Sequence, residues 1–255
     1  MKMLTDFKMK YQIKQVFLSS GTKRRSGLKA DKIRFLVAHD TGNEGSTARA
    51  NVMYYERTAN DQSASAHIFV DHAEIIECIP AQKSPEKAWH VRYDAGNTDN
   101  ERFGVEANDS SIGVELCYGT PVITREAYSK YVWTLAYLCH LYNLDPRLDI
   151  VGHFELDPKR KTDPINALKT IQKNMDDLLD DVAFELEVCR YGDDPQMQDI
   201  LKRIDALEKA NNMPIPDWAK PAVDAALRKG LLTSCEYGSR DFFKLLTMLH
   251  RAKVI

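Results

Sequence analysis

Three apolar segments that each lead to a polar side chain constrain the fold of this chain most. Apolar residues that recur with a period of two are typical of β-strands, in which alternate side chains share one face. We therefore predict three strands, each carrying a functional group in or just after an apolar run. These strands and groups are residues 32–41 with His39, residues 111–118 with Glu115, and residues 148–151 followed by His153.

The elements around these strands alternate between helical and extended patterns. Residues 1–30 are basic and are expected to be irregular. The pattern as a whole predicts a mixed strand–helix domain over residues 1–165. Its other predicted elements are a helix over 46–58 capped by Ser46 or Thr47, a hairpin over 65–79, and an amphipathic helix from the cap Thr124 to about Asn143.

Beyond Pro164 the pattern becomes helical. We expect a helical connector over residues 166–212 and a small helical module over residues 213–255, separated by a linker rich in Asn and Pro. The connector carries an apolar stripe that needs a partner surface: the main domain, the tail, or a second copy of the chain. A homodimer through the connector or the module is therefore a prediction. The stripe consists of Met197, Ile200, Ile204 and Leu207.

Charge and cysteine usage narrow the functional classes. The formal net charge of −2 over 255 residues gives no reason to expect a nucleic-acid partner or a membrane surface. No run reaches the roughly 18 to 20 apolar residues of a membrane span, and the first residues do not resemble a secretory signal. The five cysteines form no CxxC pair, which favours a reducing cytoplasm over a disulfide framework.

A metal site is one explanation of the polar residues in apolar surroundings. His39, His153 and Asp163 offer two imidazoles and a carboxylate, a ligand set that suits Zn²⁺ and leaves a position for water. Glu115 could then accept a proton from that water, and Lys161 could face a developing oxyanion. Each residue also has an ordinary interpretation, as a hydrogen-bonded histidine, an edge glutamate or a solvated lysine. Spacing alone does not decide between them, because the ligands form no compact motif.

Six segments in order between residues 25 and 164 resemble the zinc-dependent N-acetylmuramoyl-L-alanine amidases of the type-2 amidase family. This family includes phage endolysins, prophage autolysins and wall-recycling enzymes. The resemblance implies a central mixed β-sheet flanked by helices. The segments are Arg25-Ser26-Gly27 with residues 33–43 (IRFLVAHDTGN), residues 65–71 (SAHIFVD), 88–90 (AWH), 108–115 (NDSSIGVE), 151–153 (VGH) and 161–164 (KTDP).

By position, the resemblance implies one zinc ion on His39, His153 and Asp163, with Glu115 and Lys161 as catalytic groups. The implied reaction is hydrolysis of the amide between N-acetylmuramic acid and L-alanine in bacterial peptidoglycan. The alternatives are a non-catalytic peptidoglycan-binding protein and a cytoplasmic wall-recycling amidase.

The resemblance leaves several neighbouring residues with more than one interpretation. Trp89 and His90 are predicted to lie in the substrate groove, although plain packing is the alternative for His90. His67 is expected to be a buried structural histidine. Asp40 and Asn43 are expected to orient His39 through hydrogen bonds. One departure concerns a tyrosine that some relatives carry before the strand histidine, since this chain has an alanine there.

The last forty residues resemble the S-layer-homology-like unit that follows the catalytic domain of many phage lytic enzymes. Gly230 is expected to end one helix and Ser239 to cap the next. The unit is interpreted either as a cell-wall anchor or as a dimerisation element. With it, the chain is predicted to be a phage or prophage endolysin, made in the cytoplasm and released to the wall without a signal sequence.

Overall fold

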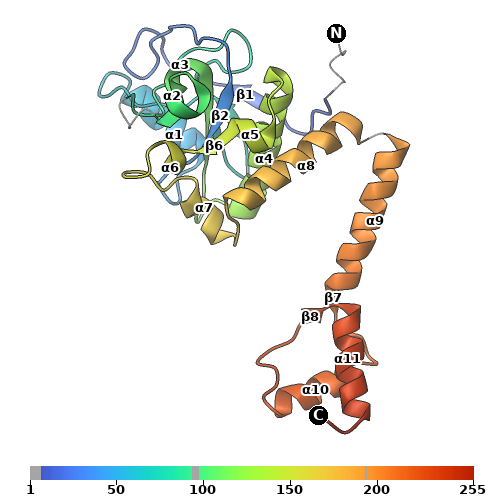
Figure 1. Ribbon diagram of the computed structural model, residues 1–255. Coiled ribbons are helices and arrows are strands. Elements are labelled where there is room, and N and C mark those ends of the chain that lie inside the picture. Colours follow the sequence, from blue (N-terminus) through green and yellow to red (C-terminus); the bar gives the residue numbers. More distant parts are fainter. Residues whose placement is uncertain (1–6, 94–97, 193) are drawn as a thin grey trace. The chain divides into compact units, whose positions relative to one another are not determined.

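A computed structural model describes residues 7–93, 98–192 and 194–255. The chain divides into two compact units, one ending at Arg190 and one from Tyr191 to Ile255 (Figure 1). The division falls within residues 166–212, the segment expected to be a connector. Within the described residues, no helix combines the length and the apolar character that a membrane span requires.

A six-stranded mixed sheet forms the centre of the first unit, in the order β1-β4-β3-β5-β2-β6. All neighbouring strands are parallel except β3 and β4, which form the predicted hairpin. The fold class expected from the resemblance is therefore confirmed. The strands are β1 (Ile13–Gln15), β2 (Phe35–Asp40), β3 (Ile68–Val70), β4 (Ile75–Glu77), β5 (Ser111–Leu116) and β6 (Ile150–Gly152).

The prediction of an irregular N-terminal segment was wrong at β1. This edge strand pairs in parallel with β4, from Ile13 opposite Ile75 to Gln15 opposite Glu77. Only three residues take part, and two of them are exposed, so no apolar alternation marks the strand in the sequence. Its pairing depends on a partner about sixty residues away, which local pattern does not report.

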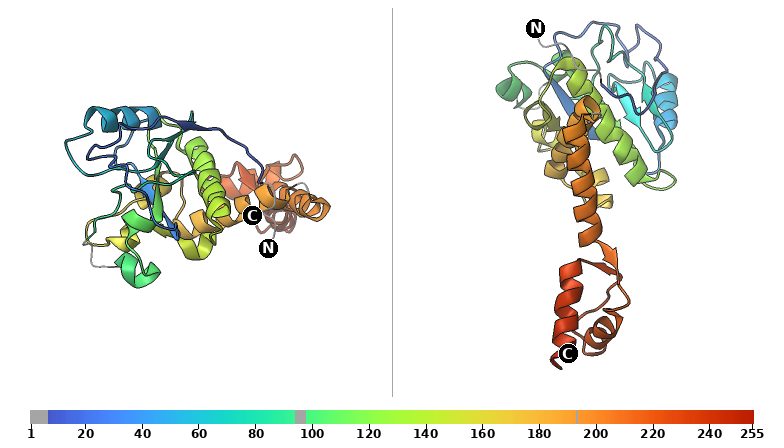
Figure 2. Two further views of the ribbon diagram at one scale, coloured as in Figure 1. Left: turned by 90° about the horizontal axis from the view of Figure 1, so that it is seen from above. Right: turned by 90° about the vertical axis from the view of Figure 1, so that its right-hand side faces the viewer.

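Eight helices of the first unit are described, and they cover both faces of the sheet (Figures 1 and 2). Thr47 caps α1 as predicted. Thr124 does not cap α4; its hydroxyl accepts from the Gly119 amide, and Ile123 precedes the helix without a side-chain cap. The helices are α1 (Ala48–Arg57), α2 (Thr98–Phe103), α3 (Ala107–Ser110), α4 (Thr124–Tyr142), α5 (Pro146–Asp149), α6 (His153–Leu156), α7 (Ile165–Thr170) and α8 (Met175–Tyr191).

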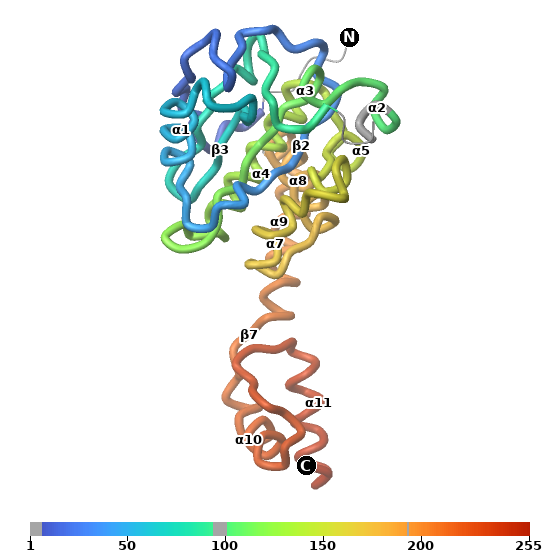
Figure 3. The backbone as a smooth tube through the Cα atoms, turned by 90° about the vertical axis from the view of Figure 1, so that its left-hand side faces the viewer, coloured from blue at the N-terminus to red at the C-terminus, as the bar shows by residue number. Residues whose placement is uncertain are grey.

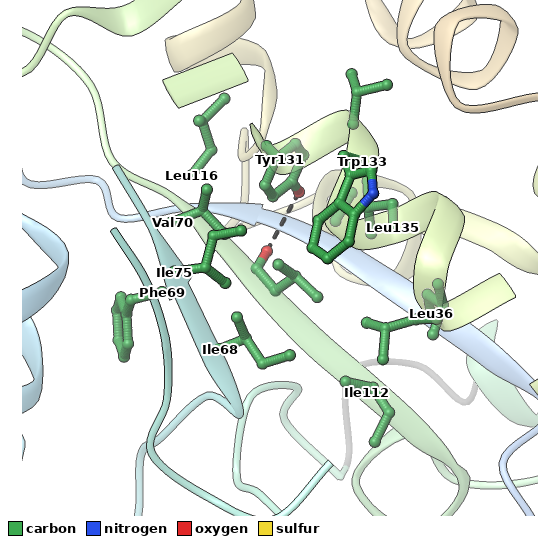
Figure 4. Close-up of a cluster of buried hydrophobic side chains, with 14 of the residues drawn as sticks. Leu36, Ile68, Phe69, Val70, Ile75, Ile112, Leu116, Tyr131, Trp133 and Leu135 are labelled. Carbon is green, nitrogen blue, oxygen red and sulfur yellow. Dashed lines mark hydrogen bonds between the residues drawn. The ribbon is translucent and has the colours of Figure 1, made fainter. Parts of the chain in front are cut away.

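The main core lies between the sheet and α4, which supplies Tyr131, Trp133 and Leu135 (Figure 4). All three are fully buried, and each aliphatic or aromatic side chain of this kind contributes roughly 1.5–3 kcal/mol. The Tyr131 hydroxyl lies 3.2 Å from the carbonyl oxygens of both His39 and Val114. It therefore ties α4 to the ends of β2 and β5. The strand residues of this core include Leu36, Ile68, Val70, Ile112 and Leu116.

The opposite face of β2 carries a smaller apolar cluster that includes Phe35 and Val37. Phe103 of α2 stacks on Phe35 with ring centroids 3.9 Å apart. Because side chains alternate along a strand, His39 projects from this same face. The second face therefore begins as apolar packing and becomes polar toward the carboxyl ends of the strands.

Three helices of the second unit are described, and two of them, α10 and α11, pack against each other (Figure 3). Their small core includes Ala222, Val223 and the fully buried Phe243. Gly230 follows α10 with a φ of 68°, and the Ser239 hydroxyl caps α11, both as predicted. The elements are α9 (Pro195–Asn211), β7 (Met213–Pro214), α10 (Lys220–Arg228), β8 (Tyr237–Gly238) and α11 (Arg240–Arg251).

Candidate metal centre

The central parallel strands deliver the predicted site residues to one edge of the sheet. His39 on β2 and Glu115 on β5 are direct neighbours in the strand register. His153 immediately follows β6, which pairs with β2 on its other side. Carboxyl ends of adjacent parallel strands meet at one edge, which is where open α/β sheets commonly bind ligands.

Asp163 reaches the same edge from the loop after α6. The loop is fixed by a backbone hydrogen bond of 3.0 Å in which the Phe154 amide donates to the Asp163 carbonyl. This bond holds Asp163 beside the residue that follows His153. The third predicted ligand is therefore placed by backbone structure as well as by its own side chain.

The three predicted ligands converge on one point. Asp163 Oδ2 lies 2.9 Å from His39 Nδ1 and 3.0 Å from His153 Nδ1. Such an arrangement could hold a metal ion. Ligand atoms around a tetrahedral zinc ion are about 3.3 Å apart, given bonds of about 2.0–2.1 Å, so a small outward adjustment of the side chains accommodates the ion.

The protonation states also suit a cation. Burial lowers the pKa of His39 to about 4, with a further contribution from His153, so this ring is neutral at pH 7. Burial alone would raise the pKa of Asp163, but the neighbouring rings of His153 and His39 hold it well below its usual range. A neutral imidazole and a carboxylate therefore face each other, as in a zinc ligand set.

The environment of Glu115 favours the protonated form of its carboxyl group. Burial raises its pKa well above the usual value, Asp163 and Asp40 add to the shift, and Lys161 opposes it. Its Oε2 atom is enclosed and has no hydrogen-bond partner among the described residues. Buried polar atoms normally have partners, so an exception in a cavity is typical of a functional group.

A cavity of about 770 Å³ lies over the cluster. Lys161 is partly exposed at its wall, and Trp89 and Tyr93 line another part with ring centroids 6.1 Å apart. Tyr55 of α1 also lines the cavity, and burial together with Glu115 raises its pKa. Sequence patterns singled out neither tyrosine, because their positions depend on how α1 and the loop after Trp89 pack.

His67 is a buried structural histidine, as predicted. The Gly113 amide donates to its Nδ1 atom at 3.0 Å, and its Nε2 atom lies 2.9 Å from the Glu86 carbonyl oxygen. Both ring nitrogens are thus used within the protein. Burial lowers the pKa of His67 to about 4, so the ring is neutral.

His90 lies beneath His39 instead of presenting a free ring nitrogen to the cavity. Its Nδ1 atom is 3.0 Å from His39 Nε2, and its Nε2 atom is 3.3 Å from Ser111 Oγ. The ring is buried, and burial lowers its pKa well below the usual value. Trp89 and His90 both line the cavity, but both ring nitrogens of His90 are engaged within the protein.

The geometry does not bring Asp40 and Asn43 to the His39 ring as predicted. Asp40 accepts hydrogen bonds from the backbone amides of Gly42 and Ala167, at 3.0 and 3.1 Å. Because Asp40 follows His39 on the strand, its side chain leaves the opposite face and holds the start of α7. Asn43 is exposed in the following loop. The ring partners of His39 are Asp163 and His90 instead.

The fold and the converging ligands define an amidase-like α/β domain with a candidate metal centre. The chain belongs to the N-acetylmuramoyl-L-alanine amidase family, whose sequence profile matches residues 29–166. This match spans all three predicted ligands and Glu115.

Relatives of known name agree with this assignment. The chain is 34% identical over 143 residues to N-acetylmuramoyl-L-alanine amidase BlyA of Bacillus subtilis (strain 168), covering 53% of this chain and 38% of BlyA. It is 31% identical over 164 residues to a probable N-acetylmuramoyl-L-alanine amidase of Bacillus licheniformis, covering 61% of this chain and 44% of that protein. The chain therefore spans less than half the length of these relatives.

Solved structures show the same fold. The catalytic domain of XlyA superimposes with a TM-score of 0.53 and 25% identity, covering 67% of this chain and 99% of that domain. Staphylococcus aureus hydrolase AmiA, solved with its ligand, gives a TM-score of 0.55 at 21% identity, covering 71% of this chain and 86% of that one. The AmiA match supports the fold alone.

Proposed function

We propose that this chain is a zinc-dependent hydrolase of the amide bond between N-acetylmuramic acid and L-alanine in bacterial peptidoglycan. One observation carries the proposal: two histidines and an aspartate converge in the cavity that also contains Glu115, whose Oε2 atom has no partner among the described residues. Family membership supports the substrate class. The complete set of ligands and carboxyl favours hydrolysis over peptidoglycan binding alone.

His39, His153 and Asp163 would hold the zinc ion. When bound, zinc polarises a carbonyl group and makes water a stronger nucleophile at neutral pH. Glu115 would take a proton from the attacking water and return it to the leaving amine. Burial raises the pKa of Glu115, which makes its carboxylate a stronger proton acceptor.

The remaining cavity residues orient the substrate and balance charge. Lys161 lies close enough to Glu115 and His39 to influence both pKa values, and it would stabilise negative charge that develops on the attacked carbonyl oxygen. Trp89 supplies an aromatic wall on which a sugar or peptide segment could pack.

A matched incubation with cell walls tests the reaction. Purified protein is mixed with walls, with and without a zinc chelator, and new L-alanine amino termini and new reducing sugars are both measured. The proposal predicts amino termini only, and their loss with chelator. New reducing sugars instead would identify a glycosidase.

We also propose that the enzyme acts as a phage or prophage lysin and that residues 213–255 bind the cell wall. The support is the resemblance of these residues to wall-anchoring units and their own small core. Phe243→Ala would disrupt that core, because Phe243 is fully buried. Sedimentation with cell walls should then show weaker binding, while cleavage of a soluble muropeptide should be unchanged. Equal sedimentation would remove the anchoring role.

The dimer, the cytoplasmic origin and the release to the wall without a signal stay predictions. The comparisons do not support the homodimer. Ile200 and Leu207 of the α9 stripe are 46% and 62% exposed, so self-association is a question for light scattering of the full chain.

A further inference from the structure

The His39 ring is the first member of a chain of hydrogen bonds that runs away from the metal centre. His39 Nε2 lies 3.0 Å from His90 Nδ1, and His90 Nε2 lies 3.3 Å from Ser111 Oγ. The Ser111 hydroxyl in turn lies 2.6 Å from the Ala107 carbonyl oxygen. All three side chains are buried.

The last bond fixes the direction of the others. A serine hydroxyl has one proton, and a carbonyl oxygen can only accept, so Ser111 donates to Ala107. Ser111 must therefore accept from His90 Nε2–H. No carboxylate among the described residues bonds the His90 ring, which lies against the His39 and His67 rings at centroid distances of 5.2 and 5.5 Å. A neutral His90 with its proton on Nε2 has a lone pair on Nδ1.

That lone pair determines the tautomer of His39. Nδ1 of His90 can only accept, so His39 Nε2 must carry the proton and donate. A neutral His39 then has its own lone pair on Nδ1, the atom that lies 2.9 Å from Asp163 Oδ2. Two atoms with lone pairs face each other at that position, and a cation between them resolves the contact.

The position of His90 is built into the surrounding strands. A side chain at Gly113 would lie 2.7 Å from Cγ and Nδ1 of His90, so only glycine at this position of β5 admits the ring. The Asn108 side chain accepts from the backbone amides of His90 and Val91, at 2.9 and 3.0 Å. The ring is thus positioned from the strand below it and from its own backbone.

We propose that His90, supported by Ser111, is a positioning residue that holds His39 in the tautomer able to bind the metal. The inference rests on the proposed function only for the identity of the metal. The second ring nitrogen of a ligating histidine generally donates its N–H to a fixed acceptor. Losing that acceptor typically weakens metal binding 10- to 100-fold. His153 lacks such support, because its Nε2 atom has no hydrogen-bond partner among the described residues.

Zinc competition with a chromophoric chelator tests the proposal on the full chain. His90→Phe keeps a ring but removes the acceptor, and it should weaken zinc binding about 10- to 100-fold. His90→Asn keeps an acceptor at the δ position and should stay within about threefold of the wild type. Ser111→Ala should give a smaller loss than His90→Phe. The matched control is His140→Asn, which replaces a histidine of α4 that is bonded to Arg190 of α8, and it should leave zinc affinity unchanged.

A second measurement separates tautomer from packing. Long-range ¹H–¹⁵N spectra of histidine-labelled, zinc-free protein should show His39 protonated on Nε2 in the wild type and in His90→Asn, but not in His90→Phe. The His153 signals should be the same in all three proteins. Three results would each refute the positioning role of His90. These are a His90→Phe variant that binds zinc as tightly as the wild type, a His90→Asn variant that loses as much zinc affinity as His90→Phe, and a wild-type His39 that is protonated on Nδ1.

The same data keep this inference apart from the proposed reaction. The variants could bind zinc in the predicted order of affinities while the wild type releases no L-alanine termini from walls. This result would support the positioning role of His90 and overturn the amidase proposal. Wild-type protein that binds no zinc would overturn both. Zinc-dependent cleavage with the same zinc affinity in every variant would overturn only the positioning role of His90.

Discussion

The two faces of the central sheet are built from the same strands, but one face packs in the apolar core and the other carries the polar groups of the candidate site. Toward α4, Leu36 and Leu116 pack with Trp133 in an apolar core. On the other face, His39 and Glu115 project from those same strands beside a cavity. One residue of register separates the two environments, because successive side chains on a strand point to opposite faces. The stable face therefore holds the strand ends in place while the polar face is free to carry charged and unpartnered groups.

The largest expected effect is on the polar face. Glu115→Gln should lower the rate of wall hydrolysis about 10²- to 10⁴-fold, because the proton acceptor is lost while the shape is kept. Zinc binding measured by chelator competition should be unchanged, since Glu115 is not one of the three converging ligands. The exposed Glu187 on α8 offers the control Glu187→Gln. Full activity in Glu115→Gln would assign the proton transfer to another group.

The next largest effect concerns the apolar face. Trp133→Ala should lower the free energy of unfolding by about 3–5 kcal/mol, because the indole is fully buried and leaves a cavity. Urea denaturation measures the change. Phe184→Ala is the control, because Phe184 on α8 is 46% exposed and should cost much less. Zinc affinity of the folded protein should stay the same, and a loss comparable to that of a ligand variant would show that the two faces are not separable.

Acid should act on the polar face through its buried histidines. Burial lowers the pKa of His67 to about 4 from an ordinary 6.5. Between pH 4 and 6.5, His67 is therefore protonated in the unfolded chain and neutral in the folded chain. Stability from this group is complete above pH 6.5 and falls by about 3 kcal/mol as the pH drops to 4.

Urea denaturation of zinc-free protein at several pH values tests this window. The Glu115→Gln background is preferred, because the raised pKa of Glu115 acts in the opposite direction. Adding His67→Gln should reduce the dependence on pH by the share of this group, while the lowered pKa values of His39 and His90 keep part of it. An unchanged slope in that variant would locate the acid sensitivity at other groups.

The smallest effect should come from the hydroxyl that ties α4 to the ends of β2 and β5. Tyr131→Phe removes a hydroxyl that lies 3.2 Å from the His39 and Val114 carbonyl oxygens, and it should cost about 1 kcal/mol of stability. Tyr237→Phe, at a 60% exposed position, is the control. Zinc affinity should fall slightly in the first variant alone, because the backbone beneath His39 is less restrained.

Local pattern in the sequence was sufficient for the parts of this fold that repeat along one segment. Alternation predicted β2 and β5. It also placed His39 at the end of its strand, on the same face as Phe35 and Val37. The hairpin of β3 and β4 and the cap at Thr47 followed from the same kind of signal. The choice of ligands needed the resemblance as well, since spacing alone left ordinary interpretations open.

The features that were missed depend on contacts between distant segments. His90 and Ser111 are 21 residues apart, and nothing local shows that a glycine on β5 leaves room for an imidazole. Asp40 was predicted to support its neighbour His39, yet strand alternation itself sends it to α7. Neighbouring residues in a sequence are easily expected to act together, but the side chains of two neighbouring strand residues lie on opposite faces of the sheet.

The backbone bond between Phe154 and Asp163 has a consequence for the rate of metal exchange. It closes the loop between two of the candidate ligands without using either side chain. An incoming ion therefore meets a loop whose ordering entropy has already been lost, and capture should be fast. Departure of the ion leaves that loop closed. The hydrogen-exchange rate of the Phe154 amide thus reports the opening of the loop itself, whether or not the centre is loaded.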